Sequence, residues 1–227
     1  MPNVQFNLTR ILFAVSCLMG LLGGLRYFLV LNYQVIGPFG GADLFDIGGK
    51  NSIQQFWSIC LWLCCACLCL AASATGRERS AWIFLSIGWM GVAIDESCQI
   101  HEKLSPMIGQ MFGVSTGVFA APWVIVAIPI VIICGLVLLP FLIRLERPIA
   151  IRLVIAGALF VGGAVGLEMA FAAASTSGRS AATILTLVTA EETLEMLGAS
   201  LFAGTVAKLL GGVNARFTEA ERTSLSR

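Results

Sequence analysis

The sequence predicts an all-α, polytopic membrane protein built as a bundle of six transmembrane helices. Of the 227 residues, 58% are hydrophobic and only 12% are charged, whereas an ordinary soluble domain is about one quarter charged. The apolar residues also gather into runs of about 20 residues, the length that a helix needs to cross a bilayer. Almost no polar stretch between these runs is long enough to form a separate domain.

Six apolar runs of spanning length define the expected helices. The first begins after Arg10 and continues to about Leu31 with no small-residue cleavage site, so we interpret it as a retained helix and not as a signal peptide. The expected spans are 11–31, 54–74, 81–103, 119–143, 153–174 and 182–209. Residues 1–210 then form one transmembrane domain, and residues 211–227 form a short polar tail in the cytoplasm.

Two of these runs carry the Gly-x-x-x-Gly spacing that lets membrane helices approach closely. Gly20 and Gly24 lie in the first run, and Gly162 and Gly166 lie in the fifth. These faces predict close packing between helices and are compatible with a homodimer.

The second run contains five of the eight cysteines. Three of them, Cys60, Cys64 and Cys67, share one helical face and would suit a soft metal such as Cu(I). Cysteine also packs well as a small hydrophobic residue, and packing is the simpler interpretation.

Basic residues are unevenly distributed between the two ends of the expected helices. Ten Lys and Arg residues lie in the N-terminal segment, the turns at 75–80 and 144–152 and the C-terminal end, against three at the opposite ends. Because Lys and Arg concentrate in cytoplasmic loops, we expect both termini on the cytoplasmic side of a bacterial-type inner membrane. The formal net charge of +1 gives no basis for a nucleic-acid partner, so the expected partner is the lipid bilayer.

Acidic residues inside the apolar runs mark the candidate site. Most of them lie in two clusters, residues 93–102 at the end of the third run and residues 190–196 in the sixth. A charge at the centre of a membrane helix costs about 2.5–3.5 kcal/mol. Several such carboxylates must therefore be protonated, paired or bridged by a cation.

Four of these carboxylates are expected at one depth. At about 1.5 Å of rise per residue, they lie between about 20 and 26 Å from the cytoplasmic ends of three helices. They belong to Asp95, Glu168, Glu191 and Glu195. Arg26 of the first helix falls at the same level and is the expected charge partner, but it can neutralise only one of them. The remaining excess of acid predicts a bound proton, alkali cation or metal ion.

The end of the third run adds further candidate ligands. On one helix, Asp95 and Glu102 share a face with His101 on its flank. The full set of candidate ligands for a metal ion, cation or proton is Asp95, Glu96, His101, Glu102, Glu168, Glu191 and Glu195.

The two acidic clusters also align with each other without gaps. Asp95-Glu-Ser-Cys-Gln-Ile100 pairs with Glu191-Glu-Thr-Leu-Glu-Met196, so that acid meets acid and Ser meets Thr. Three spans separate the two copies, which therefore run in opposite directions through the bilayer. This arrangement is typical of a 3+3 inverted repeat, whose axis brings both copies to one site. The match covers six residues, and the other spans show no obvious correspondence.

Three functions remain open. The one we favour is a transporter or channel that binds and releases a proton or a small cation at the carboxylates. The second is an intramembrane metal-dependent enzyme, in which His101 and carboxylates hold a divalent ion and Glu191 or Glu192 is the catalytic base. A single histidine is few for such an enzyme, because zinc hydrolases use two or three. The third is a non-catalytic accessory subunit, and the sequence names no cofactor.

Overall fold

The fold is all-helical in a computed structural model that describes residues 3–33 and 44–225, with side chains placed for 8–33 and 44–212. Within these ranges the chain forms no strand and seven helices, when one helix interrupted by a π-helical segment is counted once. Five of the helices are long and apolar enough to cross a membrane. The prediction of an all-α protein with several membrane-length helices is therefore confirmed.

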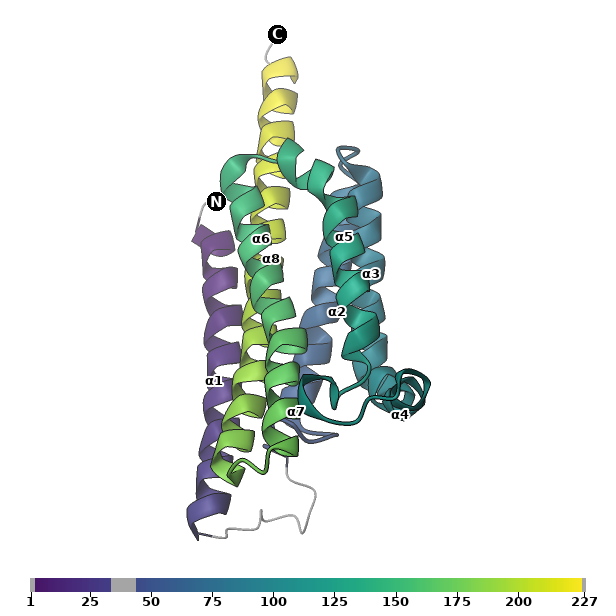
Figure 1. Ribbon diagram of the computed structural model, residues 1–227. Helices are drawn as coiled ribbons and strands as arrows, with labels where there is room; N and C mark the ends of the chain where they lie inside the picture. Colours follow the sequence, from purple (N-terminus) through teal and green to yellow (C-terminus); the bar gives the residue numbers. More distant parts are fainter. Residues whose placement is uncertain (1–2, 34–43, 226–227) are drawn as a thin grey trace.

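Four of these five helices are single elements, and the fifth is composite. The single elements are α1 (Asn3–Tyr33), α2 (Ile53–Ser73), α5 (Val124–Arg144) and α8 (Ala181–Leu225). In the composite helix, α6 (Arg147–Val161) passes through a π-helical segment, η2 (Gly162–Leu167), into α7 (Glu168–Thr176). The start of α1 and the end of α8 lie at the same end of the bundle (Figure 1).

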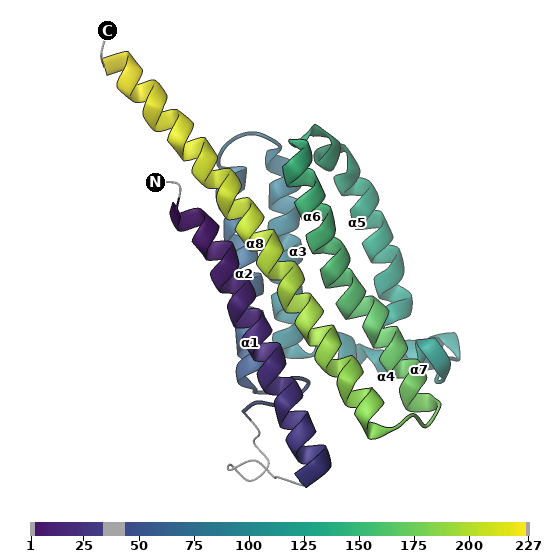
Figure 2. The same ribbon diagram turned by 90° about the vertical axis from the view of Figure 1, so that its left-hand side faces the viewer.

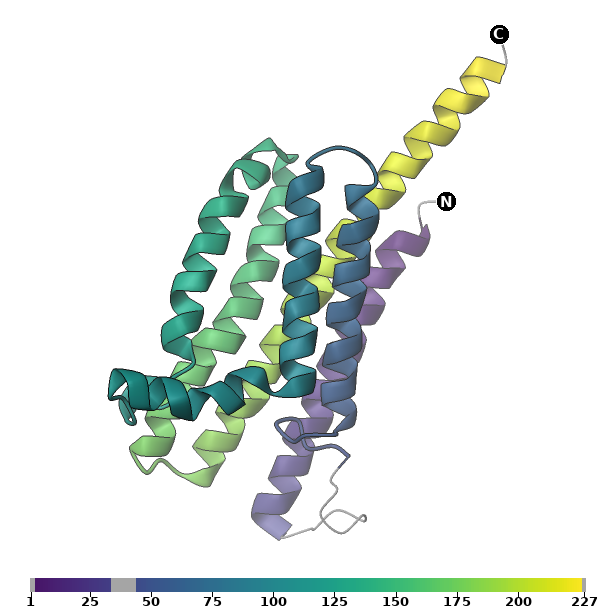
Figure 3. The same ribbon diagram turned by 90° about the vertical axis from the view of Figure 1, so that its right-hand side faces the viewer.

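A further long helix, α3 (Arg79–Cys98), packs along α2 but does not continue through the whole expected span of 81–103 (Figure 3). Gln99 has a left-handed backbone, with φ 55° and ψ 43°, and ends the helix. The next helix, α4 (Ile100–Phe112), runs across the end of the bundle remote from the termini (Figure 3). Left-handed conformations are uncommon for residues with a side chain. The break therefore gives His101 a position at the start of α4, not on the continuous helix that the sequence predicts.

Two further boundaries differ from expectation. A short 3₁₀ turn, η1 (Gly117–Phe119), precedes α5, so this helix starts later than the predicted residue 119. At the other end of the chain, α8 continues past residue 209, the predicted end of the last span, runs as helix to Leu225 and extends past the bundle (Figure 2). Residues 226–227 lie outside the described part of the chain.

The central helix of the bundle is α8, which packs against α1, α2 and α6 (Figures 1 and 2). Polar side chains connect three of these helices. Ser16 of α1 and Ser200 of α8 share a hydrogen bond of 2.9 Å, and the indole N–H of Trp57 on α2 donates to Ser16 Oγ at 3.1 Å. Such hydrogen bonds join helices in a medium where water cannot replace them.

The Gly-x-x-x-Gly pattern of the first helix faces α8. A Cβ atom built on Gly20 would lie 2.4 Å from Thr193 Oγ1, and one built on Gly24 would lie 3.5 Å from Thr189 Cγ2. The close approach predicted for this helix is confirmed.

The second Gly-x-x-x-Gly pattern does not make the contact that its spacing predicts. No atom lies within 4 Å of a Cβ built on Gly162 or Gly166. Gly163 makes the close contact instead, because its Cβ would lie 2.8 Å from the carbonyl oxygen of Glu191. Gly163 continues the face of α6 that packs on α8, because a Cβ on Gly198 of α8 would meet Ala156 and Phe160, which lie seven and three residues before Gly163.

Candidate functional site

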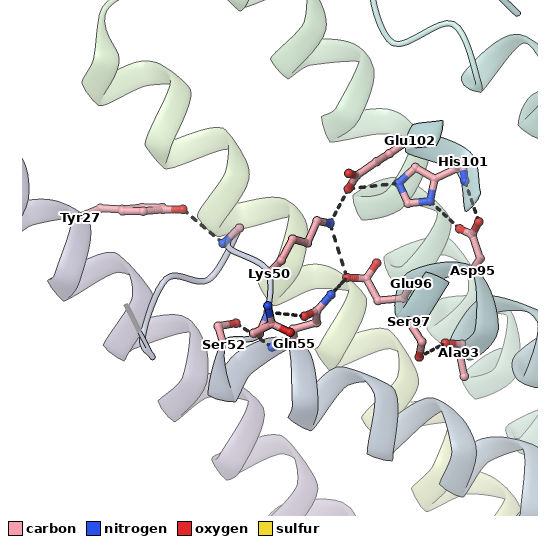
Figure 4. Close-up of polar contacts among 12 residues, drawn as sticks. Tyr27, Lys50, Ser52, Gln55, Ala93, Asp95, Glu96, Ser97, His101 and Glu102 are labelled. Atoms are coloured by element: carbon pink, nitrogen blue, oxygen red, sulfur yellow. Dashed lines mark hydrogen bonds and ion pairs between the residues drawn. The ribbon is translucent and has the colours of Figure 1, made fainter. Parts of the chain in front are cut away.

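A short segment, residues 44–52, precedes α2, lies against Tyr27 of α1 and reaches the candidate site. Its Ile47 side chain is 1% exposed and anchors the segment in the bundle. The Tyr27 hydroxyl of α1 donates a hydrogen bond to Asp46 Oδ1 at 2.7 Å and accepts one from the Gly48 N–H at 3.2 Å. These contacts fix the backbone just before the lysine that reaches the site (Figure 4).

A cavity of about 920 Å³ is lined by residues of α3, α4 and α5 and by residues of α6, η2, α7 and α8. Seven of the chain's 13 acidic residues line it, and the basic or imidazole side chains in its wall belong to Lys50 and His101. The seven acids are Asp95, Glu96, Glu102, Glu168, Glu191, Glu192 and Glu195. The seven predicted ligands are six of these acids and His101, and all of them line this one cavity. Glu192, the other candidate base of the enzyme alternative, and Lys50 line it as well.

Asp95 holds His101 across the break between α3 and α4. One carboxylate oxygen of Asp95 accepts the backbone N–H of His101 at 2.9 Å, and the other lies 2.5 Å from Nδ1 of the His101 ring (Figure 4). The first N–H groups of a helix have no partner within that helix, so Asp95 also acts as a cap for α4. The Nε2 atom of the same ring lies 3.9 Å from Glu102 Oε1.

Lys50 lies among the carboxylates at the α3–α4 break. Its ammonium group forms an ion pair with Glu102 and lies 4.0 Å from Glu96 Oε1 (Figure 4). Burial alone would lower the pKa of Lys50. The hydrogen bond that its ammonium group donates to Glu102, and the negative charges of Glu96, Glu102 and Glu192, outweigh burial and raise the pKa above its usual value of 10.5. Lys50 is therefore positively charged throughout the neutral range.

Gln55 connects this ion-pair group to the start of α2. Its side-chain amide donates to Glu96 Oε1 at 3.0 Å, and its amide oxygen accepts the Asn51 N–H at 2.7 Å. The backbone N–H of Gln55 in turn donates to Ser52 Oγ, the N-cap of α2, at 3.0 Å. A Ser N-cap stabilises the first turn of a helix, so the capping chemistry of α2 also positions Gln55 against Glu96.

A second group of acids comes from α8 and the composite helix. Glu191, Glu192 and Glu195 lie on α8, and Glu168 is the first residue of α7, directly after the π-helical segment. All four carboxyl groups line the cavity. Neighbouring carboxylates repel one another unless a proton or a cation compensates their charge.

Arg26, the expected charge partner, lies against the 44–52 segment. Its Nη2 atom is 3.5 Å from Asp46 Oδ2, and its guanidinium lies 5.0 Å from the centre of the Tyr27 ring. The cation in the cavity wall is Lys50, which the sequence interpretation did not select. The available signal was its place as the single basic residue between the first two apolar runs.

The side chains placed in the structure include no group of three or more His, Cys, Asp or Glu residues arranged to hold a metal ion. The cysteines of α2 divide into two sets. Cys65 and Cys69 are buried in the helix packing, whereas Cys60, Cys64 and Cys67 lie on the exposed face of the helix.

Comparison with known proteins gives one match. A family model described as "Domain of unknown function (DUF8692)" matches residues 10–209. No curated protein and no solved structure matches the chain. The matched region includes every residue of the cavity wall, from Gly48 to Glu195. Because the model covers most of its length, the chain belongs to the DUF8692 family.

Proposed function

We propose that this protein is a transporter or channel that binds and releases a proton or a small cation at the carboxylates of its cavity. One observation carries the proposal. Seven carboxyl groups line the cavity, whereas the side chains in its wall that can carry a positive charge belong to Lys50 and His101. The excess of acid needs further positive charge, and exchangeable protons or cations supply it.

The energy of like charges supports this proposal. Two unit charges about 4 Å apart interact by about 4 kcal/mol at an effective dielectric constant of about 20. A site with several ionised carboxylates therefore binds any cation or proton that relieves the repulsion. In this account the carboxylates bind the ion, and His101 and Glu102 lie at its outer entrance.

The proposal includes a membrane topology. It takes α3 as a sixth span, so that both termini lie in the cytoplasm of a bacterial-type inner membrane, as the distribution of Lys and Arg favours. It also takes the two acidic clusters as copies in a 3+3 inverted repeat. In support, α3 and α8 run in opposite directions, and their acidic clusters line the same cavity (Figure 1).

Ion flux in proteoliposomes tests the function. Vesicles with the purified protein, a pH-sensitive dye inside and an imposed proton or sodium gradient should show flux that empty vesicles lack. The triple variant Glu191→Gln, Glu192→Gln, Glu195→Gln should abolish it. Glu146→Gln is the matched control, because Glu146 is an exposed residue outside the cavity wall. Unchanged flux in the triple variant would remove the proposal.

One observation favours the enzyme alternative. The Asp95 carboxylate holds the His101 ring at 2.5 Å from Nδ1, and a carboxylate that orients a histidine is a common arrangement around a general base. Elemental analysis of the purified protein beside an Asp95→Asn, Glu195→Gln double variant distinguishes the two functions. Stoichiometric metal that the variant loses would support the enzyme, whereas a metal-free protein with carboxylate-dependent flux would support the transporter or channel.

A further inference from the structure

We infer that the cavity binds an amphipathic organic cation, with its charged head among the carboxylates and its apolar part against α5 and the α6–η2 segment. The inference rests on the proposed function, because it names the substrate class of the same site. Three features carry it: the size of the cavity, the chemistry of its walls and the sign of its charge.

The cavity is larger than an inorganic ion requires. A metal or alkali cation is held by a small number of oxygen ligands at short distance, whereas pockets for drug-sized organic molecules measure about 300–1,000 Å³. At about 920 Å³ the cavity lies at the upper end of that range. Its volume therefore fits an organic molecule that carries the positive charge.

The wall beyond the carboxylates is apolar. Ile130 and Val131 of α5 line it, together with Val161 and Ala164 of the α6–η2 segment. Apolar surface of this kind contributes binding energy by burying the hydrocarbon part of a ligand. A small hydrated ion gains nothing from these side chains, so they favour a ligand with an apolar part.

Aromatic side chains add a second feature that points to a ligand. Trp62, Trp123 and Phe160 line the cavity, and the faces of such rings attract organic cations. Trp62 is 2% exposed, and its indole N–H has no hydrogen-bond partner among the side chains and backbone that the structure places. Buried donors normally have a partner. The Trp62 N–H has almost no accessible surface, so the aromatic rings, and not this donor, support binding of an organic cation.

The charge of the wall selects a cation over an anion. The acidic residues in the cavity wall outnumber Lys50 and His101. The ammonium group of Lys50 already forms ion pairs with Glu102 and Glu96. An anionic head would meet repulsion from the other carboxylates, whereas an ammonium head would replace a proton or a small cation there.

Binding of tetraphenylphosphonium to the protein in lipid nanodiscs tests this inference. Tetraphenylborate, an anion of nearly the same shape, is the control for partition into lipid and for apolar binding alone. We expect saturable binding of the phosphonium, about one per chain, and no saturable binding of the borate. Ala127→Trp, which fills the cavity from α5, should weaken phosphonium binding by about tenfold or more, as expected for the loss of a filled apolar pocket.

Two further variants keep the test decisive. Ile132→Trp is the matched control, because Ile132 is an exposed residue of α5 outside the cavity wall and its replacement should leave binding unchanged. Ala164→Trp fills the cavity from η2 and replaces Ala127→Trp if that variant does not fold. Equal binding of phosphonium and borate, or binding that both filling variants leave intact, would overturn the inference. If proton or sodium flux then still depended on the carboxylates, the ligand class would be wrong and the proposed function would stand.

Discussion

Asp95 binds His101 twice, once through the backbone N–H at 2.9 Å and once through the ring at 2.5 Å. The two residues lie on either side of the left-handed Gln99, where α3 ends and α4 turns across the bundle. A single carboxylate thus caps a helix, orients an imidazole and contributes to the cavity wall. The direction of the chain at this point and the chemistry of the site depend on the same contact.

Replacing Asp95 should loosen the start of α4. Asp95→Ala removes the acceptor for the His101 N–H and should cost about 1 kcal/mol, the typical value for a lost helix cap. Asp95→Asn keeps one oxygen as an acceptor and should lose less. Hydrogen–deuterium exchange of the peptide that covers α4 should increase strongly in Asp95→Ala and only slightly in Asp95→Asn. Equal exchange in both variants would show that Asp95 does not cap the helix.

Gly163 should tolerate no side chain, unlike its neighbour. A Cβ there would lie 2.8 Å from the Glu191 carbonyl oxygen, whereas no atom lies within 4 Å of a Cβ on Gly162. Gly163→Leu should reduce stability by about 1–3 kcal/mol, the usual cost of overpacking, and should also displace the acids of α8. Thermal unfolding in detergent should show a much smaller loss for Gly162→Leu. A similar loss for both would contradict the packing described here.

The ion pairs of Lys50 should stabilise the fold across the neutral range and fail only in strong alkali. The folded-state pKa is raised above 10.5, so the stabilisation is complete below that value and is lost as the pH rises through the raised pKa. The difference in melting temperature between wild type and Lys50→Gln should stay constant from neutral pH to about pH 10 and shrink above it. A difference that varied between pH 7 and pH 9 would point to another titrating group.

Ile47 should hold the segment that carries Lys50. Its side chain is 1% exposed, and a Cβ on Gly23 would lie 2.5 Å from Ile47 Cβ. Ile47→Ala should therefore increase hydrogen–deuterium exchange in residues 44–52 and weaken the contacts of Lys50. Ile53→Ala is the matched control, because Ile53 is 37% exposed. Protection that persisted in Ile47→Ala would mean that the hydrogen bonds of Tyr27 hold the segment alone.

The helical class and the convergence of acids could be predicted from sequence because both follow from local composition. Long apolar runs predict helices, and acidic residues within them stand out because charge is costly in lipid. Counting the rise per residue placed Asp95, Glu168 and Glu191 at similar depth, and the structure lines one cavity with all three.

The details that sequence reasoning missed depend on tertiary context. Gln99 carries no glycine-like signal for a left-handed backbone, so the break after α3 was not predicted. Gly163, and not Gly162 or Gly166, lies at the helix contact, because the orientation of α6 against α8 decides which glycine faces the neighbour. Lys50 reaches the acids through a folded segment, and the path of such a segment does not follow from periodicity.

The most direct test of the central claim is infrared spectroscopy of the purified protein at neutral pH in salt-free buffer, with the carbonyl stretch of protonated carboxyl groups as the readout. The account holds that the cavity stores exchangeable positive charge among its seven carboxyl groups. It predicts a protonated carboxyl band in the wild type that weakens when sodium is added and is reduced in the triple Glu191→Gln, Glu192→Gln, Glu195→Gln variant. A wild-type spectrum without that band, identical to the variant and unchanged by sodium, would contradict it.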